Sequence, residues 1–250
     1  MKIAILSDIH GNLDALESVI QDIQKQEIKD IFICGDLAMA GPQPIETIDY
    51  INELAKQFNM SIIQGNTDEM IVKTTGQKDD PYIPPNEIMA DALKYAKKIL
   101  RQDQIQFLAN LPFSKHIEIE KLKILLVHGS PRKNNEDIMP DMPKDKLEEV
   151  FNGIEEDIIF CGHTHLPVIY ELGKQKVVNV GSVGRPFTET PDASYAVLNY
   201  LNPENNKYNI ELKKIPYDYN SASTKLAELP FKGSEKLAQM LINATSRYPQ

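Results

Sequence analysis

The chain contains no tryptophan, only two cysteines and only five histidines among its 250 residues. Two cysteines are too few for a disulfide framework, so we expect a protein of the reducing cytoplasm. No apolar run approaches the roughly 20 residues that span a bilayer, and the short apolar start of the chain meets a carboxylate too early for a secretory signal. Hydrophobic residues still make up 42% of the chain, which argues against disorder and permits a sizeable core.

Positive charge is also scarce, because 27 Lys and Arg face 36 Asp and Glu and leave a formal net charge of −9. Such a surface repels phosphate backbones and anionic lipid at long range, which disfavours nucleic acid and membranes as partners. A small phosphorylated substrate remains compatible with this charge, since a bound cation can invert the local field.

Short apolar runs that end in Gly, Asp or His predict buried strands at 2–7, 30–34, 61–64, 122–128 and 157–161. Helical patterns, the first of them with Asn12 placed to cap it, separate the first three strands. This βαβαβ opening predicts parallel strands with right-handed crossovers. Strand pairs are predicted further along at 116–120 with 122–127, 168–172 with 176–180, and 193–200 with 208–215.

The middle of the chain differs, with a Pro- and Gly-rich loop at 74–85 followed by helical patterns at 86–100 and 103–110. We expect a small helical insert at approximately 74–110, and two more helices near 221–227 and 233–243. No linker divides the sequence, so residues 1–250 are predicted to form a single domain of the α/β (α+β) class.

Seven polar side chains follow predicted strands directly, and four of the five histidines are among them. They are Asp8, His10, Asp36, Asn66, His128, His163 and His165. Ligand sites in open α/β sheets lie outside the carboxyl ends of the strands. Imidazole and carboxylate bind borderline divalent ions, and the lack of thiolate ligands disfavours a purely structural zinc site. The pattern therefore predicts a metal site, whereas His116 lies inside an alternating strand pattern and is interpreted as structural.

Five motifs in order, Asp8-x-His10, Gly35-Asp36, Gly65-Asn66, His128 and Gly162-His163-x-His165, resemble the calcineurin-like metallophosphoesterase superfamily over nearly the whole chain. Segments 7–16, 127–132 and 180–186 are similar to its small bacterial branch of phosphodiesterases and diadenosine-tetraphosphate hydrolases. The resemblance implies a four-layer αββα sandwich of two mixed sheets flanked by helices. It also implies two divalent metal ions, drawn from Mn, Fe, Zn and Mg, with manganese favoured.

The resemblance further implies which residues hold each ion. One ion is assigned to Asp8, His10, Asp36 and His165, and the other to Asp36, Asn66, His128 and His163. Asp36 is then the bridging ligand, and the ions generate a bridging hydroxide and clamp the attacking and leaving oxygens. All seven ligands are accordingly candidate catalytic residues.

Three further residues are candidates for substrate binding. Arg132 and Arg185 either grip a phosphate bidentately or are solvated loop arginines. Asn12 either assists the site or caps the following helix, and capping is favoured. Cys34 and Cys161 each precede a site glycine, and we interpret both as small buried hydrophobes rather than reactive thiols.

One position departs from the superfamily pattern. Many members carry a histidine after the Gly-Asn pair, which is proposed to protonate the leaving group, whereas this chain has Thr67 followed by Asp68. Threonine is a poor acid at neutral pH, and Asp68 would need a strongly raised pKa to replace it. We therefore expect substrates whose leaving group is already a good anion, such as phosphoanhydrides, aryl esters and dinucleoside polyphosphates.

The sequence thus predicts a cytoplasmic two-metal phosphoesterase, namely a phosphodiesterase or dinucleoside polyphosphate hydrolase that acts on a small, nucleotide-like phosphorylated substrate. A serine/threonine protein phosphatase is the alternative enzyme, disfavoured by Thr67 and by the lack of an obvious basic groove. A non-catalytic metal-binding interaction module on the same fold is disfavoured by the complete ligand set, and a metal-dependent nuclease by the acidic surface. The native metals and the oligomeric state stay open.

Overall fold

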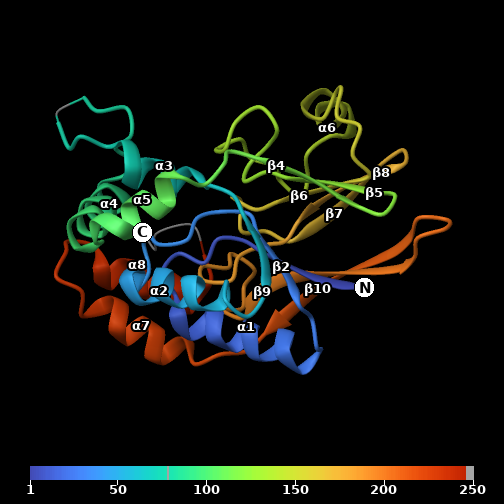
Figure 1. Cartoon of the computed structure of the whole chain (residues 1–250). Helices are drawn as coiled ribbons and strands as arrows, with labels where there is room; N and C mark the ends of the chain where they lie inside the picture. The colour runs from blue at the N-terminus through green and yellow to red at the C-terminus, as the bar shows by residue number, and fades with distance from the viewer. Residues whose placement is uncertain (78, 246–250) are drawn as a thin grey trace.

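The computed structural model describes residues 1–77 and 79–245 of the chain. Its two five-stranded sheets pack face to face, and helices cover their outer sides (Figure 1). This architecture confirms the predicted α/β fold of two mixed sheets flanked by helices.

The first sheet contains strands β1 (Lys2–Leu6), β2 (Asp30–Ile33), β3 (Asn59–Ile62), β9 (Ala193–Asn202) and β10 (Lys207–Ile215). The second contains β4 (Lys115–Ile119), β5 (Leu122–Leu126), β6 (Ile158–Cys161), β7 (Val168–Leu172) and β8 (Gln175–Asn179). The helices of the described residues are α1 (Leu13–Lys25), α2 (Pro44–Leu54), α3 (Asn66–Lys73), α4 (Glu87–Ile99), α5 (Gln102–Ala109), α6 (Lys144–Val150), α7 (Tyr219–Ala227) and α8 (Ser234–Asn243).

Each sheet contains three adjacent parallel strands. The first sheet has the order β10-β9-β1-β2-β3, in which β1, β2 and β3 run parallel and β9 runs antiparallel to β1. The second has the order β4-β5-β6-β8-β7, in which β5, β6 and β8 are parallel and both edge strands are antiparallel to their neighbours. The predicted βαβαβ opening and the three predicted hairpins are therefore confirmed, although β3 begins two residues earlier than the apolar run suggested.

Side-chain alternation along the strands divides the core into layers. Ile3 and Ile5 of β1 are fully buried between the two sheets, where they share an apolar cluster with Phe160 of β6. Ala4 and Leu6 of the same strand point to the opposite face and join the cluster beneath the helices. Because successive side chains of a strand point to opposite faces, a continuous apolar run fits a strand covered on both sides.

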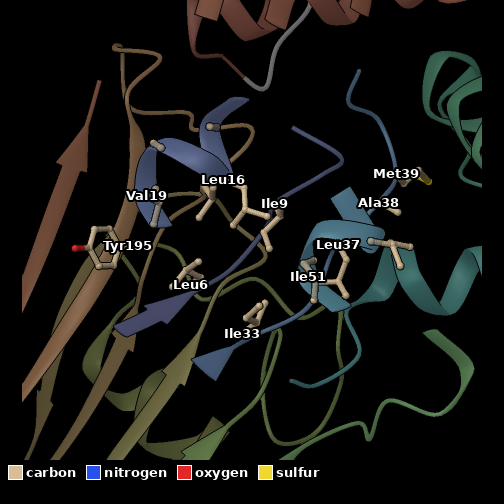
Figure 2. Close-up of a cluster of buried hydrophobic side chains, with 14 of the residues drawn as sticks. Leu6, Ile9, Leu16, Val19, Ile33, Leu37, Ala38, Met39, Ile51 and Tyr195 are labelled. Carbon is tan, nitrogen blue, oxygen red and sulfur yellow. The ribbon is translucent and has the colours of Figure 1, made fainter. Parts of the chain in front are cut away.

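The helix-side layer of the first sheet is shown in Figure 2. Leu6, Ile33 and Tyr195 rise from the sheet, and Leu16 and Val19 of α1 descend toward them. A third apolar cluster lies on the outer face of the second sheet and includes residues of α6. Burial on both faces of each sheet holds the strand ends, and hence the loops that follow them, in fixed positions.

The segment predicted as a helical insert forms α4 and α5, which pack against α3, and α4 also contacts α8. Ala92, Leu93, Ala96 and Leu108 are buried in the helix-side core. The helices α3 and α6 were not predicted, because both are short and α3 begins inside the Gly-Asn motif. Throughout the described part of the chain, every helix falls short of the length and apolar character needed to cross a bilayer.

Both cysteines are fully buried in apolar layers, Cys34 between the sheets and Cys161 on the outer side of the second sheet. Burial raises the pKa of both thiols above its usual range, so the reactive thiolate is disfavoured. Their interpretation as small buried hydrophobes is confirmed.

Candidate metal centre

The seven predicted ligands come together where strand ends of the two sheets meet. Asp8 and His10 follow β1, Asp36 follows β2 and Asn66 opens α3 after β3. From the second sheet, His128 follows β5, while His163 and His165 follow β6. Each of the seven has a polar atom within 3.9 Å of a polar atom of another member. Sequence positions separated by more than 150 residues thus form one polar cluster.

The backbone at this cluster is unusual, because five of the seven residues adopt the left-handed conformation. Their φ angles lie between 51° and 67°. The five are Asp8, His10, Asp36, His163 and His165. A left-handed residue with a Cβ atom costs roughly 1–2 kcal/mol, and such strain gathers at functional sites where the surrounding fold enforces it. The rest of the structure therefore holds these side chains in directions that an ordinary turn would not give.

Two motif glycines are required by close approach to the carboxylates. A Cβ atom on Gly65 would lie 2.1 Å from Asp36 Oδ1, and one on Gly162 would lie 2.3 Å from Asp8 Oδ2. Both separations are far below van der Waals contact, so any larger residue would displace a carboxylate of the cluster.

Asp8, His10 and His165 form the first group of possible metal ligands. Nδ1 of His10 lies 2.8 Å from the Met39 carbonyl and Nδ1 of His165 lies 2.5 Å from the Arg185 carbonyl. A carbonyl can only accept, so each Nδ1 carries a proton and each Nε2 is the ring nitrogen directed toward the cluster. Both Nε2 atoms face Asp8 Oδ1, at 3.7 Å and 3.1 Å, and lie 3.1 Å apart.

Three possible ligand atoms therefore converge at this point. Within the described chain, the buried Asp8 Oδ1 accepts no hydrogen bond. Ligands about 2.1 Å from one ion at octahedral to tetrahedral angles lie roughly 3.0–3.4 Å from each other, which is close to these separations. One carboxylate and two imidazoles at these separations are a donor set that fits a metal ion.

Asp8, Asp36 and His128 form the second group. Nδ1 of His128 donates to the Cys34 carbonyl at 2.6 Å, and its Nε2 faces Asn66 Oδ1 at 2.9 Å and Asp36 Oδ1 at 3.4 Å. The other oxygen of Asp36 lies 3.6 Å from Nε2 of His10. Both carboxylates therefore face both groups, and Asp8 as well as Asp36 lies between them.

His163 points its other ring nitrogen into the cluster. Its Nδ1 lies 2.9 Å from Asn66 Oδ1, and its Nε2 lies 3.2 Å from Asp137 Oδ1. The Asp137 carboxylate fixes the orientation of this ring, and the contact holds the pKa of Asp137 below its usual range. Asp137 was not predicted from the sequence, because it lies in an irregular loop with no motif around it.

The carboxylates and imidazoles shift one another's pKa. Burial opposes ionisation of Asp8, but His165 and His128 hold its pKa well below the usual range. Asp36 shows the same balance, with His128 and His10 lowering its pKa. Burial favours neutral His128, yet Asp36 and Asp8 raise its pKa to about 10. For His165, burial lowers the pKa more than the charge of Asp8 raises it, and the pKa falls to about 4.

Asp68 is occupied by backbone N–H groups, and the buried Thr67 hydroxyl has no hydrogen-bond partner in the described chain. Asp68 is fully buried, and its oxygens accept the backbone N–H groups of Gly65, Asp36 and Leu37 at 2.8–3.0 Å. This carboxylate ties the loop after β2 to the start of α3, although burial and the charge of Asp36 raise its pKa to about 7. The Thr67 N–H donates to Asp36 Oδ1 at 2.8 Å.

The three candidate substrate residues lie in different surroundings. Arg132 is 42% exposed and forms ion pairs with Glu136 and Glu149. Arg185 is buried, its carbonyl accepts from His165, and its guanidinium lies 5.6 Å from the centroid of the Phe187 ring. The remaining histidine, His116, is exposed on β4 and pairs with Glu156, away from the cluster.

Asn12 caps α1, as the sequence analysis favoured. Its Oδ1 accepts the N–H of Ala15 at 3.2 Å, and its Nδ2 donates to the Gly184 carbonyl at 3.0 Å and to the Tyr217 hydroxyl at 3.1 Å. The side chain is 1% exposed, so it connects the loop after β1 to two distant segments.

Comparison with known proteins decides the family. Residues 1–202 match the calcineurin-like phosphoesterase superfamily domain. The chain belongs to this superfamily. It is 30% identical over 241 residues to the uncharacterized protein MJ0912 of Methanocaldococcus jannaschii, covering 90% of this chain and 92% of that protein. It is 25% identical over 206 residues to the phosphodiesterase YfcE of Escherichia coli K12, covering 79% of this chain and 87% of YfcE.

Among solved structures, the hypothetical protein PH1004 of Pyrococcus horikoshii OT3 superposes on this phosphoesterase-superfamily chain with a TM-score of 0.83 and 26% identity. The superposition covers 97% of this chain and 98% of that one. Membership and the relationship to a phosphodiesterase support a metal-dependent hydrolase, and the candidate ligand groups agree with metal binding.

Metal binding by this superfamily member is expected to release about one proton at pH 7, because His128 must lose the proton that it holds with a pKa of about 10. Asp8 and Asp36 are already ionised at this pH and release none. Apparent metal affinity should therefore rise with pH up to about 10 and then level off. In the ion-free protein, the stabilisation from charged His128 is present below the unfolded pKa and is lost as pH rises through about 10.

Calorimetric titration of the ion-free protein in buffers of different ionisation enthalpy measures this proton count. The exposed His116→Ala variant serves as control and should behave as the parent protein. Metal binding without proton release at pH 7 would contradict the assignment of the charge to His128.

Replacing Asn12 by alanine is expected to lower the free energy of unfolding by about 1–2 kcal/mol, because the α1 cap is lost. Asn86→Ala is the matched control, since Asn86 caps α4 by accepting from Ile88 and Met89. Denaturant unfolding and kcat/KM should be measured for both variants. A drop in kcat/KM of more than about 10-fold for Asn12→Ala alone would instead place this side chain against the substrate.

Proposed function

We propose that this protein is a phosphodiesterase or dinucleoside polyphosphate hydrolase that uses two divalent ions to cleave small phosphorylated substrates. The observation that carries the proposal is the position of Asp36. One of its oxygens lies 3.4 Å from His128 Nε2 and the other lies 3.6 Å from His10 Nε2. A carboxylate whose two oxygens face two separate histidines is suited to join two ion sites.

The roles of the ligands follow the superfamily assignment. Asp8, His10, Asp36 and His165 would hold one ion, and Asp36, Asn66, His128 and His163 would hold the other. When bound, two divalent ions lower the pKa of a water nucleophile and offset negative charge on the attacked phosphate. Two dications less two carboxylates leave a local positive charge, which attracts a phosphate to an otherwise acidic protein.

The chain's own contribution is orientation. The carbonyls of Met39, Cys34 and Arg185 each accept an Nδ1–H and thereby aim three imidazole Nε2 atoms inward. Asp137 does the same for His163 from the other side of the ring. Five of the ligand residues also have a left-handed backbone, which orients their side chains. Folding supplies the free energy that this conformation costs, so the orientation exists before any substrate binds.

A good leaving group is the expected consequence of Thr67 and Asp68. Three backbone N–H groups occupy the Asp68 carboxylate, and a threonine hydroxyl does not donate a proton at neutral pH. Phosphoanhydrides and aryl diesters leave as stabilised anions without such help. This supports dinucleoside polyphosphates over the phosphoserine esters that a protein phosphatase would hydrolyse.

Steady-state hydrolysis by protein stripped of metal and reloaded with Mn, Fe, Zn or Mg tests the proposal. The panel holds bis-p-nitrophenyl phosphate, p-nitrophenyl phosphate, diadenosine tetraphosphate, a cyclic nucleotide and a phosphoserine peptide. We expect metal-dependent turnover of the diester and the dinucleotide that is lost in His128→Ala and kept in His116→Ala. Turnover of the peptide alone, or of no substrate despite bound metal, would refute the proposal.

A further inference from the structure

A cavity of about 530 Å³ opens directly beside the candidate metal centre. His163 belongs to both, and the other walls come from the loop after β5, the segment at 187–189 and the end of α8. This volume lies within the range of about 300–1,000 Å³ that is typical of small-molecule sites. A group bonded to a phosphate at the metal centre is therefore adjacent to an open cavity of suitable size.

Apolar side chains line much of this cavity. Leu166, Phe187 and Met139 contribute to its walls, and Met139 is 38% exposed although it is large and apolar. The ring of Phe187 stacks on His165, with centroids 4.3 Å apart and planes inclined by 19°. The apolar wall thus continues into the metal centre itself, and an apolar ring that enters the cavity removes this surface from water.

Two carboxylates are the charged groups among the described lining residues of the cavity. Asp137 and Glu189 line it, and no Lys or Arg is found among its described lining residues. Asp137 pairs with His163, whereas Glu189 forms no ion pair within the described chain. Arg185 lies 5.6 Å from the Phe187 ring centroid but is not a lining residue. An anionic group in the cavity would meet the Glu189 carboxylate, and the described lining supplies no cation to offset that repulsion.

We propose that this cavity binds the organic substituent of the phosphorylated substrate and selects an uncharged or cationic ring over an anionic one. The inference rests on the proposed function, because it places the attacked phosphate at the metal centre. A nucleoside attached directly to that phosphate has the required character, since it is a neutral ring system. A substituent that carries a further phosphate or carboxylate into the cavity does not.

Monosubstituted phosphonates test the proposal, because each has only one organic group to place. The probes are methylphosphonate, phenylphosphonate, 4-carboxyphenylphosphonate and 4-(trimethylammonio)phenylphosphonate. They are measured on the metal-loaded protein by calorimetry and as competitive inhibitors. Phenylphosphonate should bind about 10-fold tighter than methylphosphonate, because its ring becomes buried. The carboxyphenyl probe should bind about 10-fold more weakly than phenylphosphonate at low salt, and this difference should shrink as the salt concentration rises.

Glu189→Lys should reverse the order of the anionic and cationic probes. Glu204→Lys changes the net charge equally on the β9–β10 turn, which Figure 1 shows on the far side of the molecule from α8, and should leave the order unchanged. Met139→Ala should weaken phenylphosphonate about 3-fold and leave methylphosphonate unaffected.

Equal binding of the phenyl and methyl probes, or a charge preference that Glu189→Lys does not alter, would overturn the inference. Its failure is distinguishable from that of the proposed function. Metal-dependent turnover without ring or charge preference refutes the cavity alone. Absence of turnover refutes the proposed function, while the calorimetric order of the phosphonates still decides whether the cavity binds the ring.

Discussion

Asp36→Asn is expected to lower kcat/KM for bis-p-nitrophenyl phosphate by about 10³-fold, since several kcal/mol of transition-state stabilisation depend on the ions that this carboxylate would join. Asparagine keeps the size of the side chain and can keep the acceptor for the Thr67 N–H, which lies 2.8 Å from Asp36 Oδ1. It removes the charge shared by His128 and His10, whose Nε2 atoms lie 3.4 Å and 3.6 Å from the two oxygens. The variant should therefore fold and lose metal.

Asp22→Asn is the matched control for this experiment. Asp22 accepts from Lys213 at 2.7 Å and from the Tyr195 hydroxyl, and these partners lower its pKa against the opposing effect of burial. Its replacement should cost stability but leave kcat/KM unchanged. Metal content after dialysis, measured by mass spectrometry, completes the test. An Asp36→Asn protein with full metal content and parental kcat/KM would show that Asp36 is not a required ligand.

Thr67→His is expected to raise kcat/KM for alkyl phosphodiesters by about 10²-fold, because a positioned general acid contributes roughly 10²–10⁴-fold to such reactions. Aryl diesters should change by less than about 3-fold, since their leaving groups depart as anions without a proton. The position suits the purpose, because Thr67 is 5% exposed, adjoins Asn66, and has a hydroxyl with no hydrogen-bond partner in the described chain.

A series of diesters that share one retained group and differ in leaving-group pKa measures this effect. The parent protein should show a steep dependence of kcat/KM on leaving-group pKa, and Thr67→His a shallow one. Thr67→Asn, which offers no acid, controls for changes in packing, and unfolding curves establish that each variant folds. A parent enzyme that hydrolyses alkyl and aryl esters equally under chemistry-limited conditions would mean that a proton donor exists elsewhere.

Most strands and helices of this protein were predictable from local patterns in the sequence. Strands β1, β2, β5 and β6 are apolar runs buried on both faces, so composition and length predict them without tertiary information. The short helix α3 escaped prediction, because it starts at Asn66 and buries only Thr67, Asp68 and Ile71. Its position depends on backbone contacts with the loop after β2, which a local pattern does not encode.

The sequence by itself determined which residue types form the candidate metal site. Metals prefer carboxylate and imidazole ligands, and the positions of the strand ends restrict which of these residues can meet. What each side chain touches depended on the tertiary structure. Asp137 reaches His163 across a loop, Asp68 binds three N–H groups, and Arg132 pairs with Glu136 and Glu149. The contacts of Asp137 with His163 and of Asp68 with the loop after β2 join separate segments of the chain. Their geometry is set by sheet packing and backbone strain, which exist only once the two sheets have come together.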